Sequence, residues 1–452
     1  MQTISIPRID ASASDFVDSL ASLRHRLSPS GNIVSERGKA LTLRVFGEPL
    51  PPDEVVKRIC DDVRQLGTPA LLRYCRELDN CDATAGQLRV SQERIEQAHA
   101  KATPTFLATV RRIRENIHNF QSAILHKSVI THPQPGVSLE QRYTPLERIG
   151  ICVPGGAAAY PSTLLMTAVP AMAAGVEEIV VVAPPTNLGA YNPQVLTICH
   201  ELGIREVYAI GGAQAVAAMA YGLPEIRSVD KIVGPGSLFV ALAKRYVFGH
   251  VDIDSIAGPS EVVVIADKST RPDFAASDIL AQAEHSPGAS LLISWDRSVQ
   301  DAIDLELHKQ IGALERSELT MSALESFGAY ILACDESHAC ELTNLIAPEH
   351  LHIATVEPRS LLAKIRHSGA TFLGDYSPVA LGDYAAGPSH VLPTGGTARW
   401  ASGLSSNHFL RSSSVIEYSK EALQAIGPDI EVMANCEGLT AHRNSVSIRT
   451  QP

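Results

Sequence analysis

From about residue 147 to about residue 400, short runs rich in β-branched residues alternate with stretches that have apolar residues at helical spacing. The runs are RIGICVPGG, EEIVVVAPP, EVYAIGGAQ, DKIVGPG, EVVVIAD, SLLISW, AYILACD and TFLGDY. Strands that alternate with helices form parallel sheets that are covered by helices on both faces. The alternation divides into two blocks, at about 149–257 and about 258–400. The sequence therefore predicts an α/β fold with two doubly wound, Rossmann-like parallel-sheet domains.

The segments on either side of the two blocks have different patterns. Residues 1–52 are a polar lead-in without periodicity, which we interpret as an N-terminal extension or arm. Residues 53 to about 125 have apolar residues at helical spacing; in the first helix Asp53 is a plausible N-cap and Gly67 the end. We expect these helices to share a core with the second block, and the last fifty residues to form a small appended unit.

The charge of the chain narrows the classes of partner. With 38 basic against 49 acidic residues the formal net charge is −11, and there is no basic run. Nucleic acids and anionic membranes bind basic patches, so neither is expected as a partner. The N-terminal residues lack a signal-peptide pattern, and the longest apolar stretch, 164–176, is shorter than the roughly 20 residues of a membrane helix. We expect a cytoplasmic protein whose eight cysteines, none in a CxxC pair, are reduced thiols.

Three glycine-rich turns follow predicted strands of the first block. They are Val153-Pro154-Gly155-Gly156, Gly211-Gly212-Ala213-Gln214 and Gly234-Pro235-Gly236-Ser237. Ligands of open α/β sheets bind outside the carboxyl ends of strands, where glycine lets a backbone approach a phosphate or ribose. None of the turns is a G-x-G-x-x-G, so they indicate either a ligand site or ordinary strand-to-helix turns.

The second block carries most of the candidate chemistry. Gln282 and His285 are i,i+3 neighbours at the end of a predicted helix; they fit a metal-ligand pair, or else a surface glutamine and a helix-terminal histidine. Glu349 and His350 follow Pro348, and an adjacent glutamate and imidazole suit proton transfer, or else form a polar turn before a strand. His352 has no evident role.

Two further segments are rich in groups that bind ligands. Residues 382–394 are predicted to be a long loop with glycine and proline, in which Asp383 is a possible metal ligand and His390 a hydrogen-bond donor or ligand. Near the C-terminus, Glu437 and His442 lie on either side of a turn with Gly438. A terminal segment with such groups suggests a tail that docks into a site, possibly that of a partner subunit.

Five extended motifs occur in order in the second half of the chain: AGPSEVVVIAD, AQAEH, NLIAPEHL, GDYAAGPSHVLPTGGTAR and EGLTAHRNSVSIR. Together they closely resemble the histidinol dehydrogenase family, and the resemblance extends from about residue 53 to 450. It implies an intertwined, zinc-dependent homodimer. The implied reaction oxidises L-histidinol through L-histidinaldehyde to L-histidine with two NAD, at the end of histidine biosynthesis.

The resemblance also implies a role for each candidate residue. The zinc ligands would be Gln282, His285 and Asp383 of one subunit and His442 of the other. His350 would be the general base that takes the alcohol proton, and Glu349 would activate the water that attacks the aldehyde. The residues that contact the substrate would be Ser260, Gln282, His285, His350, Asp383, His390, Glu437 and His442, with Glu437 and His442 supplied by the partner. NAD would be contacted by Gln214 and at positions 152 and 237.

With these roles, the chain is expected to form four units. They are an N-terminal extension (1–52), a catalytic and metal-binding α/β domain (53–148 with 258–400), a Rossmann-like nucleotide-binding domain (149–257) and a C-terminal domain that docks onto the partner (401–452). The chain departs from the family at two cofactor positions. Cys152 replaces the usual tyrosine before V-P-G-G, and Ser237 replaces the usual asparagine after G-P-G. Both changes remove expected contacts to NAD, which leaves the nucleotide affinity open.

Several alternatives remain on sequence grounds. A paralogous dehydrogenase could act on another small amino-alcohol or diol, although Glu437, His390 and His442 argue against it. A zinc hydrolase could use Glu349 and His350 to activate water, but it leaves the glycine turns without a role. A non-catalytic zinc scaffold would be expected to use cysteines. An aldehyde dehydrogenase with a Cys152 thioester is also conceivable, and manganese or cobalt could replace zinc.

Overall fold

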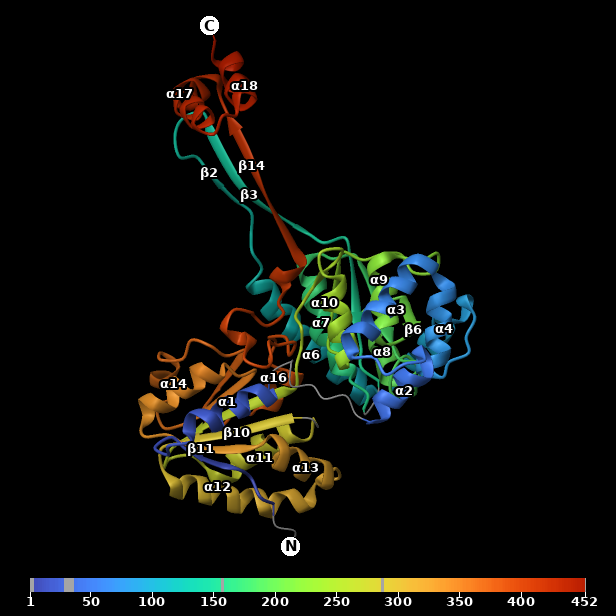
Figure 1. The fold of residues 1–452 in the computed structure, drawn as a ribbon, viewed down its shortest axis with the longest axis vertical. Coiled ribbons are helices and arrows are strands. Elements are labelled where there is room, and N and C mark those ends of the chain that lie inside the picture. Colours follow the sequence, from blue (N-terminus) through green and yellow to red (C-terminus); the bar gives the residue numbers. More distant parts are fainter. Residues whose placement is uncertain (1–3, 28–35, 156–157, 286–287, 452) are drawn as a thin grey trace.

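The structure, a computed structural model, describes residues 4–27, 36–155, 158–285 and 288–451. Figure 1 shows two lobes, each built around a parallel sheet, and a long, narrow arm that ends in two helices. The N-terminus lies at the lobe that contains β10 and β11, and the C-terminus lies at the tip of the arm (Figure 1). The two predicted parallel sheets are therefore present, and the arm is an additional feature.

The first lobe contains a five-stranded parallel sheet in the order β6-β5-β4-β7-β8. Its strands are β4 (Arg148–Cys152), β5 (Glu178–Ala183), β6 (Glu206–Ala209), β7 (Lys231–Val233) and β8 (Asp252–Ile253). Val180 and Val182 of β5 face one hydrophobic cluster, whereas Val181 and Ala183 face another. Both faces are therefore buried, which explains the continuous apolar runs. The strand order reverses between β4 and β7, the position where open α/β sheets bind ligands.

Helices cover both faces of this sheet. On one face lie α7 (Pro161–Ala174) and α8 (Pro193–Glu201), and on the other lie α9 (Gly212–Tyr221) and α10 (Leu238–Val247). The helices α9 and α10 each begin directly after a glycine turn that follows a strand. The order strand, glycine turn, helix thus agrees with the sequence pattern.

The helices between residues 52 and 123 pack against the first lobe. They are α3 (Pro52–Leu66), α4 (Thr68–Asp79), the 3-10 turn η2 (Ala85–Gln87), α5 (Gln92–Ala100) and α6 (Pro104–Ala123). Ile59 and Leu71 join the hydrophobic cluster of α9 and α10, and Ile95 and Ile117 join that of α7 and α8. The structure therefore corrects the expectation that 53–148 shares a core with 258–400. The apolar stripe of an amphipathic helix suits either sheet, and only tertiary packing decides between them.

The boundaries of the first of these helices differ slightly from the prediction. Pro51, and not Asp53, occupies the N-cap position, and Pro52 begins the helix. Proline suits this position because an N–H in the first turn has no acceptor within the helix, so its absence costs no hydrogen bond. Gly67 ends the helix with φ +67°, as expected from its sequence position.

The second lobe contains a six-stranded parallel sheet in the order β1-β11-β10-β9-β12-β13. Its strands are β1 (Arg8–Asp10), β9 (Ser260–Ala266), β10 (Gly288–Ser294), β11 (Ala329–Leu332), β12 (His350–Ala354) and β13 (Ala370–Leu373). Val262 and Val264 face one cluster, whereas Val263 and Ile265 face the other. This sheet is therefore also covered on both faces, as predicted for a doubly wound fold.

The helices of the second lobe follow its strands in the chain. They are α11 (Pro272–Ala283), α12 (Arg297–Gln310), η3 (Ile311–Ala313), α13 (Ser317–Phe327), α14 (Glu336–Ile346), α15 (Pro358–Leu362) and α16 (Val379–Tyr384). The helix α16 corrects the predicted loop at 382–394 in part, because residues 382–384 belong to this helix, whereas residues 385–394 lie outside any helix or strand, as predicted. Flanking glycine and proline concealed a helix of only six residues.

The N-terminal residues are integrated into the two lobes. The strand β1 pairs in parallel with β11, and Ile4, Ile6, Leu20 and Leu23 are buried in the clusters of the second lobe. Ile4 and Ile6 precede β1, Leu20 and Leu23 belong to α1 (Phe16–Leu27), and α2 (Glu36–Phe46) lies near α4 of the first lobe. The interpretation of residues 1–52 as a separate arm is therefore corrected, since a few apolar residues suffice to anchor them.

The arm is formed by two segments that are far apart in the sequence. An antiparallel sheet joins β2 (Val129–Thr131), β3 (Val137–Pro145) and β14 (Leu410–Tyr418), and β14 pairs with β3 along its whole length. The 3-10 turns η4 (Thr397–Arg399) and η5 (Ser406–Phe409) precede β14, and α17 (Lys420–Cys436) and α18 (Thr440–Thr450) form the tip. Residues 129–145 and 410–450 thus build one extended unit (Figure 1).

No helix within the described ranges could span a membrane. The helix α6 has 20 residues but carries Arg111, Arg112 and Arg114, whereas α7 is apolar but has only 14 residues. A membrane helix needs both properties together.

Candidate functional site

A cleft of about 410 Å³ lies between the two parallel sheets. One wall is formed by the turns that follow β4 and β7, including Pro154 and residues 234–238. The other wall contains Ser260, Glu349 and His350, which stand at the amino ends of β9 and β12. The first sheet thus contributes its carboxyl edge, where ligands of such sheets normally bind, and the second contributes its amino edge.

A chain of hydrogen bonds links three elements of the second lobe. The Ser260 hydroxyl donates to Oε2 of Glu349 at 2.6 Å, and Nε2 of Gln282 donates to the Ser260 oxygen at 2.8 Å. The backbone N–H of Glu261 also donates to Oε2 of Glu349 at 3.0 Å. Gln282 and Glu349 are buried, at 2% and 6% exposure, so their polar groups depend on these partners. The network fixes one oxygen of Glu349 and leaves the other free of these contacts.

His350 lies between two carboxylates. Its Nδ1 is 3.7 Å from Oε2 of Glu349, and its Nε2 is 3.6 Å from Oδ1 of Asp383. Burial by itself would lower the pKa of His350, but the charges of Glu349 and Asp383 outweigh it and raise the pKa to about 9. Nδ1 is buried and makes no hydrogen bond within the described residues. A proton on His350 is therefore stabilised by its neighbours, while one ring nitrogen stays available.

Glu261 is a second buried carboxyl group beside Glu349 that the sequence analysis did not identify. It is 1% exposed, and its oxygens accept hydrogen bonds from the backbone N–H groups of Glu349 and Gly395. Burial and the charge of Glu349 raise the pKa of Glu261 to about 8. Burial also raises the pKa of Glu349, against the effect of His350. The adjacency of Glu261 to Ser260 was the only sequence signal for it.

The remaining candidates of the second lobe lie around the same cleft. Asp383 is at the end of α16, and its backbone carbonyl lies 3.0 Å from Nδ1 of His390. His285 is exposed two residues beyond α11 and lines the cleft. Burial opposes ionisation of Asp383, but its contact with His350 outweighs burial and lowers the pKa of Asp383. Burial lowers the pKa of His390. The structure thus brings together Ser260, Gln282, His285, Glu349, His350, Asp383 and His390.

His352, to which the sequence analysis gave no role, holds the supporting elements together. Its Nδ1 lies 2.8 Å from Oδ2 of Asp278, although the angle departs from hydrogen-bond geometry, and its Nε2 contacts the carbonyl of Gly374 at 3.0 Å. Asp278 also accepts a hydrogen bond from the N–H of Val379. Asp278 belongs to α11 and Val379 begins α16, so the pair joins the elements that carry Gln282, His350 and Asp383.

The donor atoms at the cleft are of the kinds that bind a metal ion. Within the described residues no group of three or more histidine, cysteine, aspartate or glutamate side chains forms a metal site. His285 and Asp383 supply two such groups at the cleft, and the Gln282 amide uses its NH₂ toward Ser260, so its oxygen is the available donor. Nitrogen and oxygen donors of this kind fit zinc, and three ligands leave a coordination position open. The residues of one chain therefore fit zinc, but they do not complete a set of four ligands.

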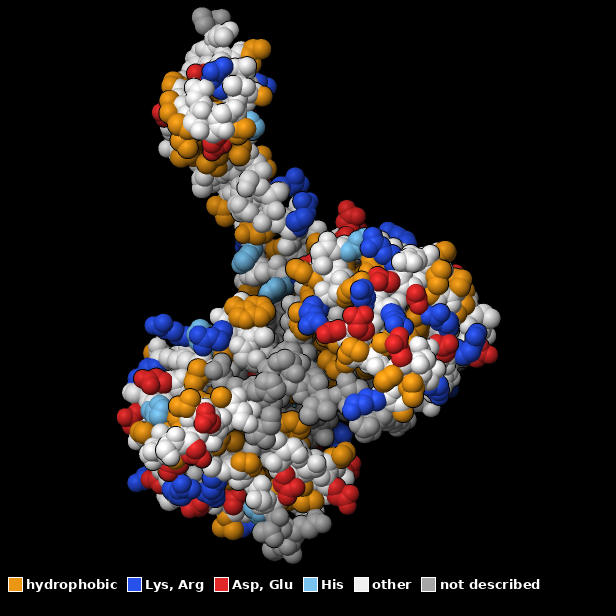
Figure 2. All heavy atoms as spheres, viewed as in Figure 1, with side chains coloured by type: hydrophobic (Ala, Val, Ile, Leu, Met, Phe, Trp, Pro, Cys, Tyr) orange, Lys and Arg blue, Asp and Glu red, His pale blue; other side chains and the backbone are white. Residues whose placement is uncertain are grey.

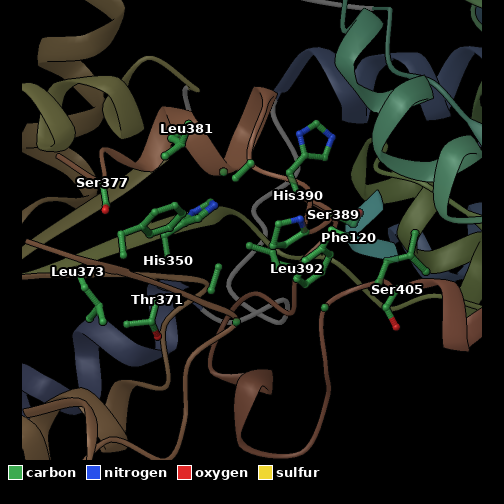
Figure 3. Close-up of a pocket in the computed structure, with 18 of the residues that line it drawn as sticks. Phe120, His350, Thr371, Leu373, Ser377, Leu381, Ser389, His390, Leu392 and Ser405 are labelled. Atoms are coloured by element: carbon green, nitrogen blue, oxygen red, sulfur yellow. The ribbon is translucent and has the colours of Figure 1, made fainter. Parts of the chain in front are cut away.

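A second cavity, of about 680 Å³, lies on another side of the histidines. Figure 3 shows it between His350 and Leu381 on one side and Phe120 and Ser405 on the other, with His390 and Leu392 at its wall. His350, His390 and Leu392 line both cavities and therefore separate them. The sequence contained no signal for this cavity, because its walls come from four distant segments.

The predicted NAD contacts are placed unequally. Ser237 lines the cleft as the N-cap of α10. Gln214 is 1% exposed, and its Nε2 donates to Asp79 at 2.9 Å. Cys152 is buried, and burial raises the pKa of its thiol to about 12. A protonated, covered thiol argues against the alternative of a Cys152 thioester. Gly156 of the first glycine turn lies outside the described residues, as do Ser286 and Pro287.

Glu437 and His442 lie far from the cleft of their own chain. Glu437 caps the end of α17 and His442 is in the first turn of α18, both exposed at the tip of the arm. Figure 1 shows this tip well separated from both lobes. Within one chain, the structure therefore does not bring these two residues to the other candidates.

Comparisons with known proteins agree with this architecture. A family model described as histidinol dehydrogenase matches residues 51–450. The histidinol dehydrogenase of Rhodopirellula baltica is 62% identical over 450 residues, which cover 99% of this chain and 98% of that protein. That of Heliobacterium mobile is 45% identical, covering 88% of this chain and 93% of that protein. The crystal structure of histidinol dehydrogenase from Elizabethkingia anophelis is similar with a TM-score of 0.89 and 31% identity, covering 99% of each chain.

The family match spans both lobes and the arm, and it confirms the resemblance inferred from the five motifs. It also excludes the hydrolase and scaffold alternatives, since the family is one of dehydrogenases. The chain belongs to the histidinol dehydrogenase family.

Proposed function

We propose that this enzyme oxidises L-histidinol through L-histidinaldehyde to L-histidine, with two NAD and with zinc in the cleft. The observation that carries the proposal is a chain of contacts along one wall of the cleft, which runs from Gln282 through Ser260, Glu349 and His350 to Asp383. The opposite wall is the carboxyl edge of the first sheet, where nucleotides bind in folds of this kind. Side chains that can transfer protons and a glycine turn that can bind a nucleotide thus line the same cleft. A four-electron oxidation of one small substrate needs this combination.

The first oxidation removes a proton from the alcohol oxygen and a hydride from the adjacent carbon. His350 is the proton acceptor, because its Nδ1 is buried without a hydrogen-bond partner in the described chain. The carboxylates of Glu349 and Asp383 stabilise the imidazolium that forms. A divalent cation beside Asp383 would offset part of that negative charge and lower the pKa of His350, so that more of the imidazole is in the neutral form that can accept a proton.

The second oxidation requires one water molecule, which adds to the aldehyde carbon to give a hydrate. Glu349 takes a proton from that water, because burial raises the pKa of its carboxyl group and makes it a stronger base. The Ser260 hydroxyl fixes Oε2 of Glu349 at 2.6 Å, and we assign the proton transfer to the other oxygen of this carboxyl group. As the water adds, the protonated His350 returns its proton to the aldehyde oxygen and the hydrate forms. The hydrate then loses a hydride and two protons to give the carboxylate, one proton passing to His350 and the other to solvent.

The two absent groups have defined tasks. Zinc, held by Gln282, His285 and Asp383, would orient the substrate and polarise its donor atoms, while NAD supplies the hydride acceptor at the turns after β4 and β7. Ser260 and His390 would contact the substrate from the same wall. Because the described part of one chain supplies an incomplete ligand set, the fourth ligand comes from elsewhere.

The fourth ligand is His442 of the partner subunit, and Glu437 of the partner subunit contacts the substrate. Support comes from the arm, which carries an exposed apolar surface that a monomer would leave in water. Its residues include Val129, Ile130, Ile416, Val432, Met433 and Ile448, with exposures between 54% and 72%. Figure 2 shows hydrophobic side chains at the tip of the arm. Such patches mark protein interfaces, and an extended arm favours exchange between two copies.

The proposal is tested by counting NADH. With L-histidinol in limiting amount, two NADH per histidinol are expected, since each molecule loses four electrons. Treatment with a chelator should abolish the reaction, and added zinc should restore it. Formation of only one NADH per histidinol would contradict the second oxidation, and unchanged activity after complete removal of metal would contradict the zinc site.

A further inference from the structure

A buried ion pair lies beneath the turn that follows β7. Lys244 of α10 and Asp254, after β8, have side chains that are 2% and 3% exposed, and Nζ of Lys244 lies 2.5 Å from Oδ1 of Asp254. Both residues contribute to the lining of the cleft between the sheets. Two fully desolvated charges persist only where they are paired and where their remaining hydrogen bonds are satisfied. The contacts that satisfy them indicate what the pair does.

The pair holds both backbone groups of Gly234. The ammonium of Lys244 donates to the carbonyl of Gly234 at 3.0 Å, and the N–H of Gly234 donates to Oδ2 of Asp254 at 2.7 Å. Oδ1 of Asp254 also accepts from the N–H of Ser255 at 2.6 Å. The peptide at Gly234 is therefore fixed from both sides by two side chains from different elements.

Gly234 itself needs this support. It has φ +101°, in a region that favours glycine, and a Cβ at this position would lie 2.3 Å from the carbonyl oxygen of Cys152. Gly234, which follows β7, thus lies against Cys152, the last residue of β4, at the position where the strand order reverses and where a dinucleotide would lie. Backbone geometry here determines the position of residues 235–238, which line the cleft.

A second lysine–aspartate pair in the same sheet, in which the lysine is buried and the aspartate side chain is 51% exposed, provides a comparison. Nζ of Lys231, in β7, lies 2.7 Å from Oδ2 of Asp252, in β8, and the lysine side chain is 5% exposed. Neither residue lines the cleft, and the pair stands at the amino ends of the two strands. Lys231 and Asp252 thus join β7 to β8 without contact to the turn, whereas Lys244 and Asp254 hold the turn itself.

We propose that Lys244 and Asp254 are positioning residues for the dinucleotide, which set the Gly234–Ser237 turn in the conformation that receives it. The inference rests on the proposed function for the identity of the nucleotide. Cys152 is buried and Ser237 has a short side chain, so neither residue extends a long side chain toward the dinucleotide. The backbone of the turn therefore makes a larger share of the contacts that bind the dinucleotide. The pair acts through the turn and does not touch the reacting atoms.

The test uses the zinc-loaded full-length enzyme and measures NAD binding by isothermal titration calorimetry, which is independent of turnover. One substitution alone would leave its partner charged and buried, so the main variant is Lys244→Met with Asp254→Asn. It should raise the Kd for NAD by about tenfold or more, because a displaced turn loses contacts along the nucleotide. The KM for histidinol and the zinc content should stay within about twofold of the parent values. The matched control is Lys231→Met with Asp252→Asn, whose Kd for NAD should not change.

Equal losses of NAD affinity in the main and control variants, or an unchanged Kd in the main variant, would overturn the proposal. Lys244→Arg keeps the charge but changes the donor geometry, and it should give an intermediate Kd. If neither Lys244 variant folds while the control does, the pair serves folding and the positioning role is wrong. Binding of NAD by a parent enzyme that forms no NADH from histidinol would contradict the proposed function and leave this inference intact.

Discussion

Glu349 and Glu261 are adjacent buried carboxyl groups, but only Glu349 lines the cleft. If Glu349 activates water, Glu349→Gln should slow oxidation of the aldehyde by about 10²–10⁴-fold, while oxidation of histidinol to the aldehyde is affected much less. Single-turnover measurements with histidinol and with histidinaldehyde separate the two steps. Glu261→Gln is the matched control and should affect both steps little. Equal slowing of both steps in Glu349→Gln would show that Glu349 has no special part in the hydration.

Glu261 also predicts a pH dependence of stability. Its pKa is raised from 4.5 to about 8 by burial and by Glu349, so between these values the folded state binds more protons than the unfolded chain. The free energy of unfolding therefore falls as the pH rises from about 4.5 to 8, because the carboxyl ionises freely in the unfolded chain but stays protonated in the folded state. Glu261→Gln removes this loss. The Tm of Glu261→Gln relative to the parent should thus increase from pH 5 to pH 8.5, by about 1 °C per kcal/mol, because the entropy of unfolding grows with chain length. A constant difference would mean that Glu261 is ionised throughout.

At the level of the site, the sequence predicted which residue types gather but not how they are supported. Gln282, His285 and Asp383 were identified from motifs, and the structure places them around one cleft. Glu261 and the pair His352–Asp278 were missed, because their importance comes from burial and from contacts over about ninety residues of sequence. Only tertiary structure determines such contacts.

Among the secondary-structure elements, the central strands were the most predictable. Their runs are apolar because both faces are covered, as the division of Val262 and Val263 between two clusters illustrates. The three-residue strand β1 and the arm strands could not be predicted. β1 is too short for a periodic signal, and β14 is largely exposed on both faces, so it lacks an apolar alternation.

The helix α3 tests the corrected domain assignment. Ile59 is 1% exposed and belongs to the hydrophobic cluster of α9 and α10 in the first lobe. Ile59→Ala should reduce the free energy of unfolding by about 2–5 kcal/mol, because the cavity cannot close completely. Since α9 and α10 begin at the glycine turns, NAD affinity should fall with stability while zinc affinity is retained. Denaturant unfolding and calorimetric titration measure both. Loss of zinc affinity with unchanged NAD affinity would instead place α3 with the second lobe.

For the whole molecule, the arm is the feature from which we infer that two subunits make one active site. Residues 129–145 and 410–450 extend together from the lobes, and the apolar side chains of the arm are exposed in a single chain. A monomer would leave this surface in contact with water, whereas an exchanged dimer would bury it and bring α17 and α18 to a second copy. The sequence indicated a docking tail from Glu437 and His442, but not the antiparallel arm that carries them.

Subunit mixing distinguishes a site completed by the partner from one closed by the chain's own tail. His442→Ala and Gln282→Ala enzymes should each be inactive, since each removes a zinc ligand from every site. After the subunits are exchanged under mild denaturation and refolded together, each mixed dimer contains one site with both residues intact. With random pairing, half of the dimers are mixed and about a quarter of the sites recover. Recovery would therefore approach about a quarter of the parent activity and zinc content. If His442 served its own chain, every site in the mixed dimer would lack one ligand, and neither activity nor zinc would return.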